Sequence, residues 1–360
     1  MLNFIIKVVV NYIIKVVLKL CLSANTKYSH AKSDRRKGMF MRKLNFSILC
    51  AGNIAKKMAK TISMMPDKAV PYAIASRDIK KAKRLADKYN FLKAFDSYET
   101  MLKDPEVDVV YVASPNSCHY EHVKLCLEQE KHVLCEKPFT VNERQAAELF
   151  GIAKEKNLFV GEAMWTVFLP YTLELKKLIS DGIIGDISFM QVSFGSDMTR
   201  TERLISPELA GGALLDLGVY TIAFMKTFFG KDIKSIKSSS VFLESGVDGK
   251  SCTVVTYNDG KIAALSSDMT AILGNKAVIY GNKGHIEVKD FWCAESFAVY
   301  NNRGDMTEYA FPFEINGYAY EIGKLYEAVN EGKLEYDQWT QEDTISVLHI
   351  CDQIRDEWKK

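Results

Sequence analysis

Several features that would set this chain apart from ordinary globular enzymes are missing. No stretch reaches the roughly 18–20 uninterrupted apolar residues of a membrane span, because lysine and asparagine interrupt the apolar N-terminal segment. The eight cysteines include no C-x-x-C pair, so they indicate neither a thiol redox motif nor a disulfide scaffold. The remaining composition, 48% apolar and 26% charged over 360 residues, is globular and predicts two domains.

Clustered positive charge is also missing from the body of the chain. Residues 1–43 carry ten Lys and Arg against one acid, which leaves 37 basic against 44 acidic residues over the rest. A mildly acidic body lacks the cations that phosphate contacts require, so a nucleic-acid-binding protein is disfavoured. The scattered cysteines, several within apolar runs, are typical of reduced, buried thiols and favour a cytoplasmic protein.

Residues 1–38 form a basic leader that the sequence separates from the fold. Three interpretations of it remain open: a dispensable, disordered extension, an amphipathic helix on a membrane surface, and a cleaved export signal. The first is favoured, because Ser23–Gly38 is polar and a strand-like run starts soon afterwards, at Leu44. None of the three requires a stable membrane span.

Strand and helix patterns alternate through residues 39–161. Apolar runs of strand length recur, with amphipathic stretches of about 10–15 residues between them. This alternation predicts right-handed βαβ crossovers and a doubly wound parallel sheet, a Rossmann domain. The predicted strands are Leu44–Ala51, Val70–Ser76, Val107–Ala113, His132–Cys135 and Leu158–Gly161, and the predicted helices are Asn53–Met65, Asp78–Tyr89, Ser117–Glu130 and Asn142–Lys156.

The turn after the first predicted strand occupies the place of the dinucleotide fingerprint G-x-G-x-x-G/A. Gly52 keeps the position at which the backbone approaches a pyrophosphate, and Ala55 keeps the small residue that lets helix and strand pack. Cys50 stands in place of the first glycine. An ordinary βα turn is the alternative, but the position on the first strand of a βαβ array favours dinucleotide binding, with Asn53 and Ile54 beginning the helix.

The end of the second predicted strand bears on the choice of nicotinamide cofactor. An acidic residue there would bind the ribose 2′-hydroxyl of NAD(H), but the chain has Ser76 and Arg77. A hydroxyl and a guanidinium suit a 2′-phosphate, so NADP(H) is favoured over NAD(H). The alternative is that Arg77 is a solvated loop residue and that Asp78 only caps a helix.

Two further positions suggest acid–base chemistry. Lys137 ends a predicted parallel strand, at the sheet edge where ligands of open α/β sheets bind, and precedes a proline that can take a cis bond. Asp216 and Tyr220 lie four residues apart in a helical stretch, so both side chains project from one face. The alternatives are a surface lysine and a core aromatic residue.

Together these motifs resemble the Gfo/Idh/MocA oxidoreductase family, and the likeness spans about Leu44 to Trp358. Within that family the sequence looks like the branch of trans-1,2-dihydrobenzene-1,2-diol dehydrogenases and NADP-dependent D-xylose dehydrogenases. The stretches that carry the likeness are Ala51–Ala55, Ser114–His119, Glu136–Pro138, Glu162–Thr166, Gly211–Tyr220 and Gly281–Glu287 with Phe291–Trp292.

The resemblance implies that residues 162–360 form a C-terminal α/β domain for substrate and dimerisation, with a large, mostly antiparallel sheet and a homodimer built on it. Strand-like runs separated by turn pairs such as Asp259–Gly260 agree with that sheet. The predicted strands are Asp186–Gly195, Ser251–Tyr257, Ile262–Asp268, Ala277–Tyr280 and His285–Val288, and the predicted helices are Ala213–Phe229, Tyr318–Glu331 and Gln341–Lys359.

By the same resemblance, Lys137 and Tyr220 share the acid–base task and Asp216 orients Lys137 or the substrate. An ammonium close to Tyr220 would help it reach the phenolate form. The implied cofactor-binding residues are Gly52, Asn53, Ile54, Ser76, Arg77, Ser114, Asn116, His119, Glu136 and Lys137, and the implied substrate wall is Trp165 and Phe168. No metal site is predicted, because no second clustered pair joins the H-x-x-H at His119 and His122.

Two departures from the family pattern limit this transfer: Cys50, at the first glycine position, and Val167, where an arginine often follows Trp-Thr. The resemblance implies hydride transfer between NADP(H) and a sugar, polyol or vicinal diol. Reduction of a carbonyl or ketosugar by the same chemistry, and a dinucleotide-sensing regulator without turnover, are the alternatives. The sequence leaves the substrate and the direction of the reaction open.

Overall fold

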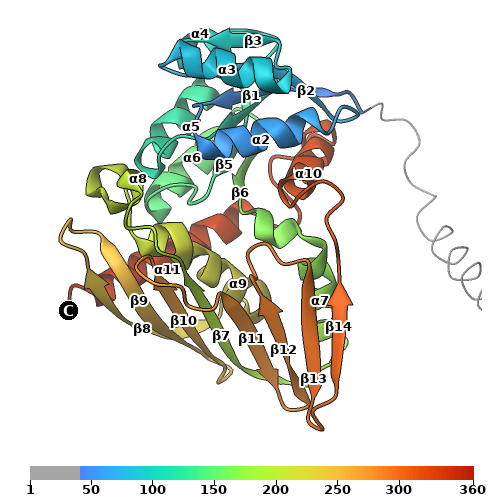
Figure 1. The fold of residues 1–360 in the computed structure, drawn as a ribbon, viewed down its shortest axis with the longest axis vertical. Helices are drawn as coiled ribbons and strands as arrows, with labels where there is room; N and C mark the ends of the chain where they lie inside the picture. Colours follow the sequence, from blue (N-terminus) through green and yellow to red (C-terminus); the bar gives the residue numbers. More distant parts are fainter. Residues whose placement is uncertain (1–40) are drawn as a thin grey trace, which may run out of the picture. The chain divides into compact units, whose positions relative to one another are not determined.

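A six-stranded parallel sheet forms the first layer of the fold. The computed structural model describes residues 41–360, so the interpretations of residues 1–38 lie outside the described residues. The strand order is β3-β2-β1-β4-β5-β6, with every neighbouring pair parallel (Figure 1). The strands are β1 (Leu44–Leu49), β2 (Ala69–Ala75), β3 (Lys93–Phe95), β4 (Val109–Val112), β5 (His132–Glu136) and β6 (Val160–Ala163).

Helices cover this sheet, and its strands are apolar because they are buried beneath them. All four residues of β4 are buried, as expected for a central parallel strand. The first crossover helix buries Ala55, Met58 and Ile62 at helical spacing, so it lays one apolar stripe on the sheet. The helices of this part are α2 (Asn53–Ser63), α3 (Ile79–Tyr89), α4 (Tyr98–Leu102), η1 (Asn116–Cys118), α5 (His119–Glu128) and α6 (Glu143–Glu155).

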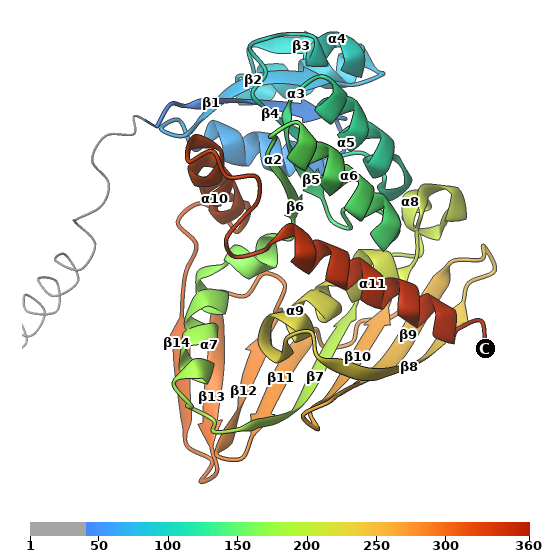
Figure 2. The same ribbon diagram turned by 180° about the vertical axis from the view of Figure 1, so that it is seen from behind.

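An eight-stranded sheet forms the second part, in the order β14-β13-β12-β11-β7-β10-β9-β8. All of its pairs are antiparallel except β7 with β10. Figures 1 and 2 show α7, α9 and α11 on one face, whereas no helix of residues 41–360 covers the other. The strands are β7 (Ile187–Gly195), β8 (Ile233–Phe242), β9 (Asp248–Tyr257), β10 (Ile262–Asp268), β11 (Lys276–Gly281), β12 (Gly284–Lys289), β13 (Ser296–Asn301) and β14 (Met306–Ala310).

The helical segments of the second part connect the two sheets. A π-helical turn, η4, runs directly into α9, so the predicted helix over 213–229 exists but begins with a wider turn. Such turns recur at functional sites. The segments are η2 (Trp165–Phe168), α7 (Pro170–Ser180), α8 (Glu202–Ile205), η3 (Pro207–Leu209), η4 (Leu214–Gly218), α9 (Val219–Phe229), α10 (Tyr318–Asn330) and α11 (Gln341–Glu357).

The predicted fold class is confirmed: a Rossmann-type parallel sheet is followed by a large, mostly antiparallel sheet. The stretch Pro207–Phe229 is long and apolar enough to span a membrane, judged by length and composition alone, but 78% of its apolar 18-residue segment is buried within the fold. The described cysteines are all free, and residues 41–360 contain no cluster of three or more metal-ligating side chains.

Candidate active site

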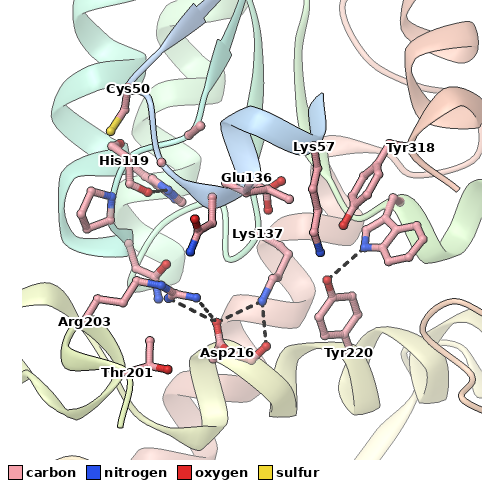
Figure 3. Close-up of a pocket in the computed structure, with 18 residues that line it drawn as sticks. Cys50, Lys57, His119, Glu136, Lys137, Thr201, Arg203, Asp216, Tyr220 and Tyr318 are labelled. Atoms are coloured by element: carbon pink, nitrogen blue, oxygen red, sulfur yellow. Dashed lines mark hydrogen bonds and ion pairs between the residues drawn. The ribbon is translucent and has the colours of Figure 1, made fainter. Parts of the chain in front are cut away.

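A cavity of about 470 Å³ opens at the carboxyl ends of β1, β4 and β5 and reaches across to η4 and α9. Its volume lies in the usual range for small-molecule sites. Figure 3 shows its lining side chains, which come from both parts of the fold. The lining residues are Cys50, Gly52, Asn53, Ile54, Lys57, Ala113, Ser114, Pro115, Asn116, His119, Glu136, Lys137, Trp165, Thr201, Arg203, Asp216, Tyr220 and Tyr318.

The N-terminus of α2 faces this cavity with nothing in front of it. Gly52 caps the helix without a side-chain hydrogen bond, no acidic residue stands in the first turn, and a Cβ at Gly52 would meet no atom within 4 Å. Free N–H groups and the positive end of the helix dipole therefore point into the cavity, an arrangement that suits a pyrophosphate. Cys50 has φ 81°, so the backbone here takes the conformation that the missing glycine would favour.

Ser76 and Arg77 follow β2 but do not line the cavity itself. The Asp78 side chain accepts a hydrogen bond from the Lys80 amide and so caps α3. Arg77 is close enough to Tyr98 and His122 to lower both pKa values, although burial has the larger effect on each and raises that of Tyr98 to about 12. Arg77 and Cys50 both act on Tyr98, and Cys50 lines the cavity, so the guanidinium lies near the Cys50 end of the cavity, while the Asp78 carboxylate caps α3.

Lys137 and Asp216 meet across the two parts of the fold. Lys137 Nζ donates to the Asp216 carbonyl at 2.8 Å and to Asp216 Oδ1 at 3.2 Å, and Arg203 contacts the same Oδ1 at 3.4 Å. Burial alone would raise the pKa of Asp216, but the charges and hydrogen bonds of Lys137 and Arg203 outweigh it and lower that pKa. Asp216 is therefore an ionised carboxylate held by two cations. The Lys137–Pro138 peptide bond is cis.

Tyr220 lies on the same wall as Asp216. Its hydroxyl accepts a hydrogen bond from Trp165 Nε1 at 3.0 Å, and Lys137 Nζ lies 4.8 Å from the centre of its ring (Figure 3). The ammonium thus lies over the ring face and is hydrogen-bonded to Asp216, whereas the phenol oxygen is hydrogen-bonded to Trp165. Burial, reinforced by Glu136 and Tyr318, raises the pKa of Tyr220 well above its ordinary value. Without substrate, Tyr220 is a neutral phenol, contrary to the expected ease of forming a phenolate.

Glu136 has a structural partner below the cavity. The buried Tyr111 hydroxyl donates to its carboxyl group, and burial raises the pKa of Glu136. Glu321 on α10 lies behind it, fully buried, and neither of its carboxyl oxygens has a hydrogen-bond partner among the described residues. Burial and the nearby Glu136 raise the pKa of Glu321 well above the usual range, so Glu321 is a neutral acid.

Two predicted residues after β4 take different roles. The Asn116 amide donates to the Ala210 carbonyl at 3.1 Å and so ties this loop to η3. The ring nitrogens of His119 lie 2.8 Å from the Pro138 carbonyl and 2.9 Å from that of Ser114. Burial lowers the pKa of His119 to about 4. With both ring nitrogens at backbone carbonyls, His119 supports the loop while it also lines the cavity.

One predicted substrate residue is misplaced. Phe168 is 3% exposed, does not line the cavity and packs on Tyr336 with ring centres 4.6 Å apart. The reason is the turn of η2, which sends Trp165 to the cavity and Phe168 into the core. Six lining residues were not predicted: Lys57, Ala113, Pro115, Thr201, Arg203 and Tyr318. The sequence could have indicated Lys57, because it follows Ile54 by about one helical turn and so lies on the same face of the helix. No sequence pattern indicates that Thr201, Arg203 or Tyr318 lines the cavity.

Fold and site together define a class of protein. The strand order 3-2-1-4-5-6, with a cavity at the carboxyl edge beside an uncapped first helix, is the arrangement of dinucleotide-binding Rossmann proteins. The residues present fit a dinucleotide: an open helix N-terminus suits the diphosphate, and an arginine lies near the Cys50 end of the cavity. A phenol, an ammonium and an ionised carboxylate line its far end.

Comparison with known proteins identifies the particular family. Residues 44–163 match the oxidoreductase family with an NAD-binding Rossmann fold, Gfo/Idh/MocA, and residues 172–287 match the Gfo/Idh/MocA C-terminal domain. The chain belongs to the Gfo/Idh/MocA oxidoreductase family.

Relatives at moderate identity cover most of the chain. It is similar to trans-1,2-dihydrobenzene-1,2-diol dehydrogenase of Xenopus tropicalis, 34% identical over 86% of this chain and 96% of the relative. The enzyme of that name from Mus musculus is 33% identical over 82% and 86%.

Solved structures agree in fold. A 3-ketoreductase from Actinomadura kijaniata, crystallised with NADP and TDP-benzene, has a TM-score of 0.82 at 24% identity, covering 88% of this chain and 98% of that one. An aldose-aldose oxidoreductase from Caulobacter crescentus, complexed with glycerol, has a TM-score of 0.80 at 20% identity over the same shares.

Proposed function

We propose that this protein is an NADP-dependent dehydrogenase that acts on a CH–OH group of a sugar, polyol or vicinal diol. The observation that carries the proposal is the convergence of Lys137, Asp216 and Tyr220 on one wall of a cavity whose opposite wall is the open N-terminus of α2. The relatives named as diol dehydrogenases support the substrate class.

The chain's own residues then divide the work. A bound nicotinamide dinucleotide supplies the hydride acceptor or donor. Tyr220 exchanges the proton with the substrate oxygen: it takes the alcohol proton in oxidation and donates its phenol proton to the carbonyl in reduction. Lys137 carries positive charge beside that oxygen, and Asp216 holds Lys137 in place through the 3.2 Å contact. Trp165 fixes the Tyr220 hydroxyl.

One observation favours carbonyl reduction as the second candidate. The raised pKa of Tyr220 leaves the phenol protonated, which is the form that donates to a carbonyl oxygen. Oxidation requires the phenolate, so its rate should rise with pH, whereas the rate of reduction, which uses the phenol, should not.

The preference for NADP(H) rests on the second strand. The Asp78 side chain caps α3, so Arg77 is the charged side chain after β2 that is available near the Cys50 end of the cavity. A guanidinium pairs with a 2′-phosphate through charge-assisted hydrogen bonds. Gly52, Asn53 and Ile54 would hold the diphosphate, with Ser114, Asn116 and Glu136 lining the path toward Lys137.

The organisation around the site is part of the proposal. Residues 39–161 would bind the dinucleotide and residues 162–360 the substrate, in a cytoplasmic homodimer joined through the face of the eight-stranded sheet that no helix covers. Sedimentation of the purified chain tests the dimer.

A substrate panel tests the activity. Purified protein is incubated with NADP⁺ or NAD⁺ and with benzene dihydrodiols, aldoses, inositols and linear polyols, and nicotinamide absorbance is followed. The matching ketones with NADPH test the reverse direction. We expect turnover with NADP⁺ on at least one diol or sugar. Tight NADPH binding without turnover in either direction across the panel would instead indicate a dinucleotide-sensing protein.

A further inference from the structure

Lys57 brings a third cation into the cavity, and the proposed mechanism does not use it. It lies one turn into α2 and lines the cavity. Its side chain is solvent-exposed. Its ammonium makes no hydrogen bond or ion pair with any residue in the range 41–360. In Figure 3 it points away from α2 into the cavity, on the side of Tyr220 and Tyr318.

The other two cations of the cavity share one protein counter-ion. Lys137 and Arg203 share the Asp216 carboxylate, at 3.2 and 3.4 Å. The second acid, Glu136, accepts the Tyr111 hydroxyl, and burial raises its pKa. The positive charge of Lys57 therefore lacks a protein counter-ion within the described part of the cavity.

The position of Lys57 separates it from the expected diphosphate site. The open N–H groups of α2 lie at the Gly52 end, near Cys50, whereas Lys57 lies toward Tyr318 (Figure 3). The charge of Lys57 lowers the pKa of Cys293, against the larger effect of burial. The neighbouring Trp292 carbonyl accepts a hydrogen bond from Thr166, which adjoins Trp165. Lys57 and Trp165 line the same cavity.

We propose that Lys57 binds an anionic group of the substrate, so that the preferred substrate is a sugar or polyol carrying a carboxylate or phosphate. The inference rests on the proposed function, because it places the reacting alcohol at Tyr220 and Lys137. An ammonium accepts either anion as a point charge. A charge-assisted hydrogen bond in a partly open cleft corresponds to about a tenfold gain in affinity.

Binding to the NADPH complex tests the inference without requiring turnover. Glucose, glucuronate and glucose 6-phosphate differ only at carbon 6, so they form a matched neutral, carboxylate and phosphate series. Each is titrated into the enzyme–NADPH complex while NADPH fluorescence is followed. We expect at least one anion to bind about tenfold more tightly than glucose, and Lys57→Ala to remove that preference while leaving the affinity for glucose unchanged. Which anion is preferred identifies the group.

Lys56→Ala is the matched control, because Lys56 is an exposed lysine of the same helix outside the cavity. It should preserve the preference. Equal binding of all three ligands by the wild type would overturn the inference, and so would an equal loss for all three in Lys57→Ala. A weaker affinity of Lys57→Ala for NADPH, with the anion preference intact, would assign Lys57 to the cofactor phosphates instead. Absence of turnover in the substrate panel refutes the proposed function alone.

Discussion

The two ends of the cavity are built in different ways. The turn end, Cys50 to Ile54, is one continuous βα turn that offers backbone N–H groups and no charged side chain. The catalytic end draws Lys137, Trp165, Asp216 and Tyr220 from three separate segments and holds them by buried ion pairs and hydrogen bonds. Substitutions at the turn end should therefore change affinity or stability modestly, whereas those at the catalytic end should change the rate.

The largest effect is expected at the catalytic end. Lys137→Ala removes the ammonium beside the reacting oxygen and one of the two cations on Asp216. We expect kcat to fall by about 10²–10⁴, with the Kd for NADPH unchanged within about threefold. Steady-state kinetics and NADPH fluorescence measure the two quantities. A comparable fall in NADPH affinity would erase the distinction between the two ends.

Tyr220→Phe tests the same end with less disturbance of packing. The ring stays in place, but the proton-transfer group is lost, so kcat should again fall by about 10²–10⁴. The substitution also leaves Trp165 Nε1 without its acceptor, so Trp165→Phe serves as the control. If Trp165→Phe lowers kcat as much as Tyr220→Phe does, the loss comes from packing of this wall and not from proton transfer.

Substitution of Arg77, near the Cys50 end of the cavity, should change the affinity for one cofactor only. Arg77→Ala removes the cation available for a 2′-phosphate, so we expect the KM for NADP⁺ to rise about 10- to 100-fold and that for NAD⁺ to stay within a few-fold. Lys83→Ala, an exposed lysine on α3, is the control. An equal rise for both cofactors would remove the case for NADP(H).

Stability should depend on pH through Asp248, which supports the catalytic end from β9. Its carboxylate accepts the Leu214 amide at 2.6 Å at the start of η4, and burial raises its pKa to about 6. Because the folded state binds this proton more tightly than the unfolded chain, the contribution is full below about pH 4 and is lost as pH rises through 6. The free energy of unfolding should fall by about 2 kcal/mol over that range. Denaturant titrations measure it, and Asp248→Asn should show no such slope.

The contrast between the continuous turn end and the catalytic end, which is assembled from separate segments, also explains how much of the structure could be predicted from the sequence. The strands of the parallel sheet and the turn at Gly52 are local patterns, so their positions agree with the structure within about two residues. Four strands were missed: β3, β8, β13 and β14. Arg203 could not be predicted, because only tertiary folding brings α8 to Asp216. Phe168 shows the same limit: a turn of η2 decides which aromatic side chain reaches the cavity.

The smallest effect concerns the conformation of Cys50. An L-residue in the left-handed region costs about 1–2 kcal/mol, whereas a glycine there costs about 0.5–1 kcal/mol of extra unfolded-state entropy. Since Cys50 has φ 81°, Cys50→Gly should stabilise the fold by up to about 1 kcal/mol, a rise of about 1–3 °C in Tm.

Cys50→Ala separates the effect of the backbone from that of the thiol, because it keeps the Cβ and its strain and should give no gain in stability. Asn90→Gly, at φ 58° on the C-cap of α3, should also be nearly neutral, since Asn tolerates this region. If Cys50→Ala stabilises as much as Cys50→Gly in thermal melts, the thiol and not the backbone is the source of strain, and the turn end no longer depends on backbone conformation alone.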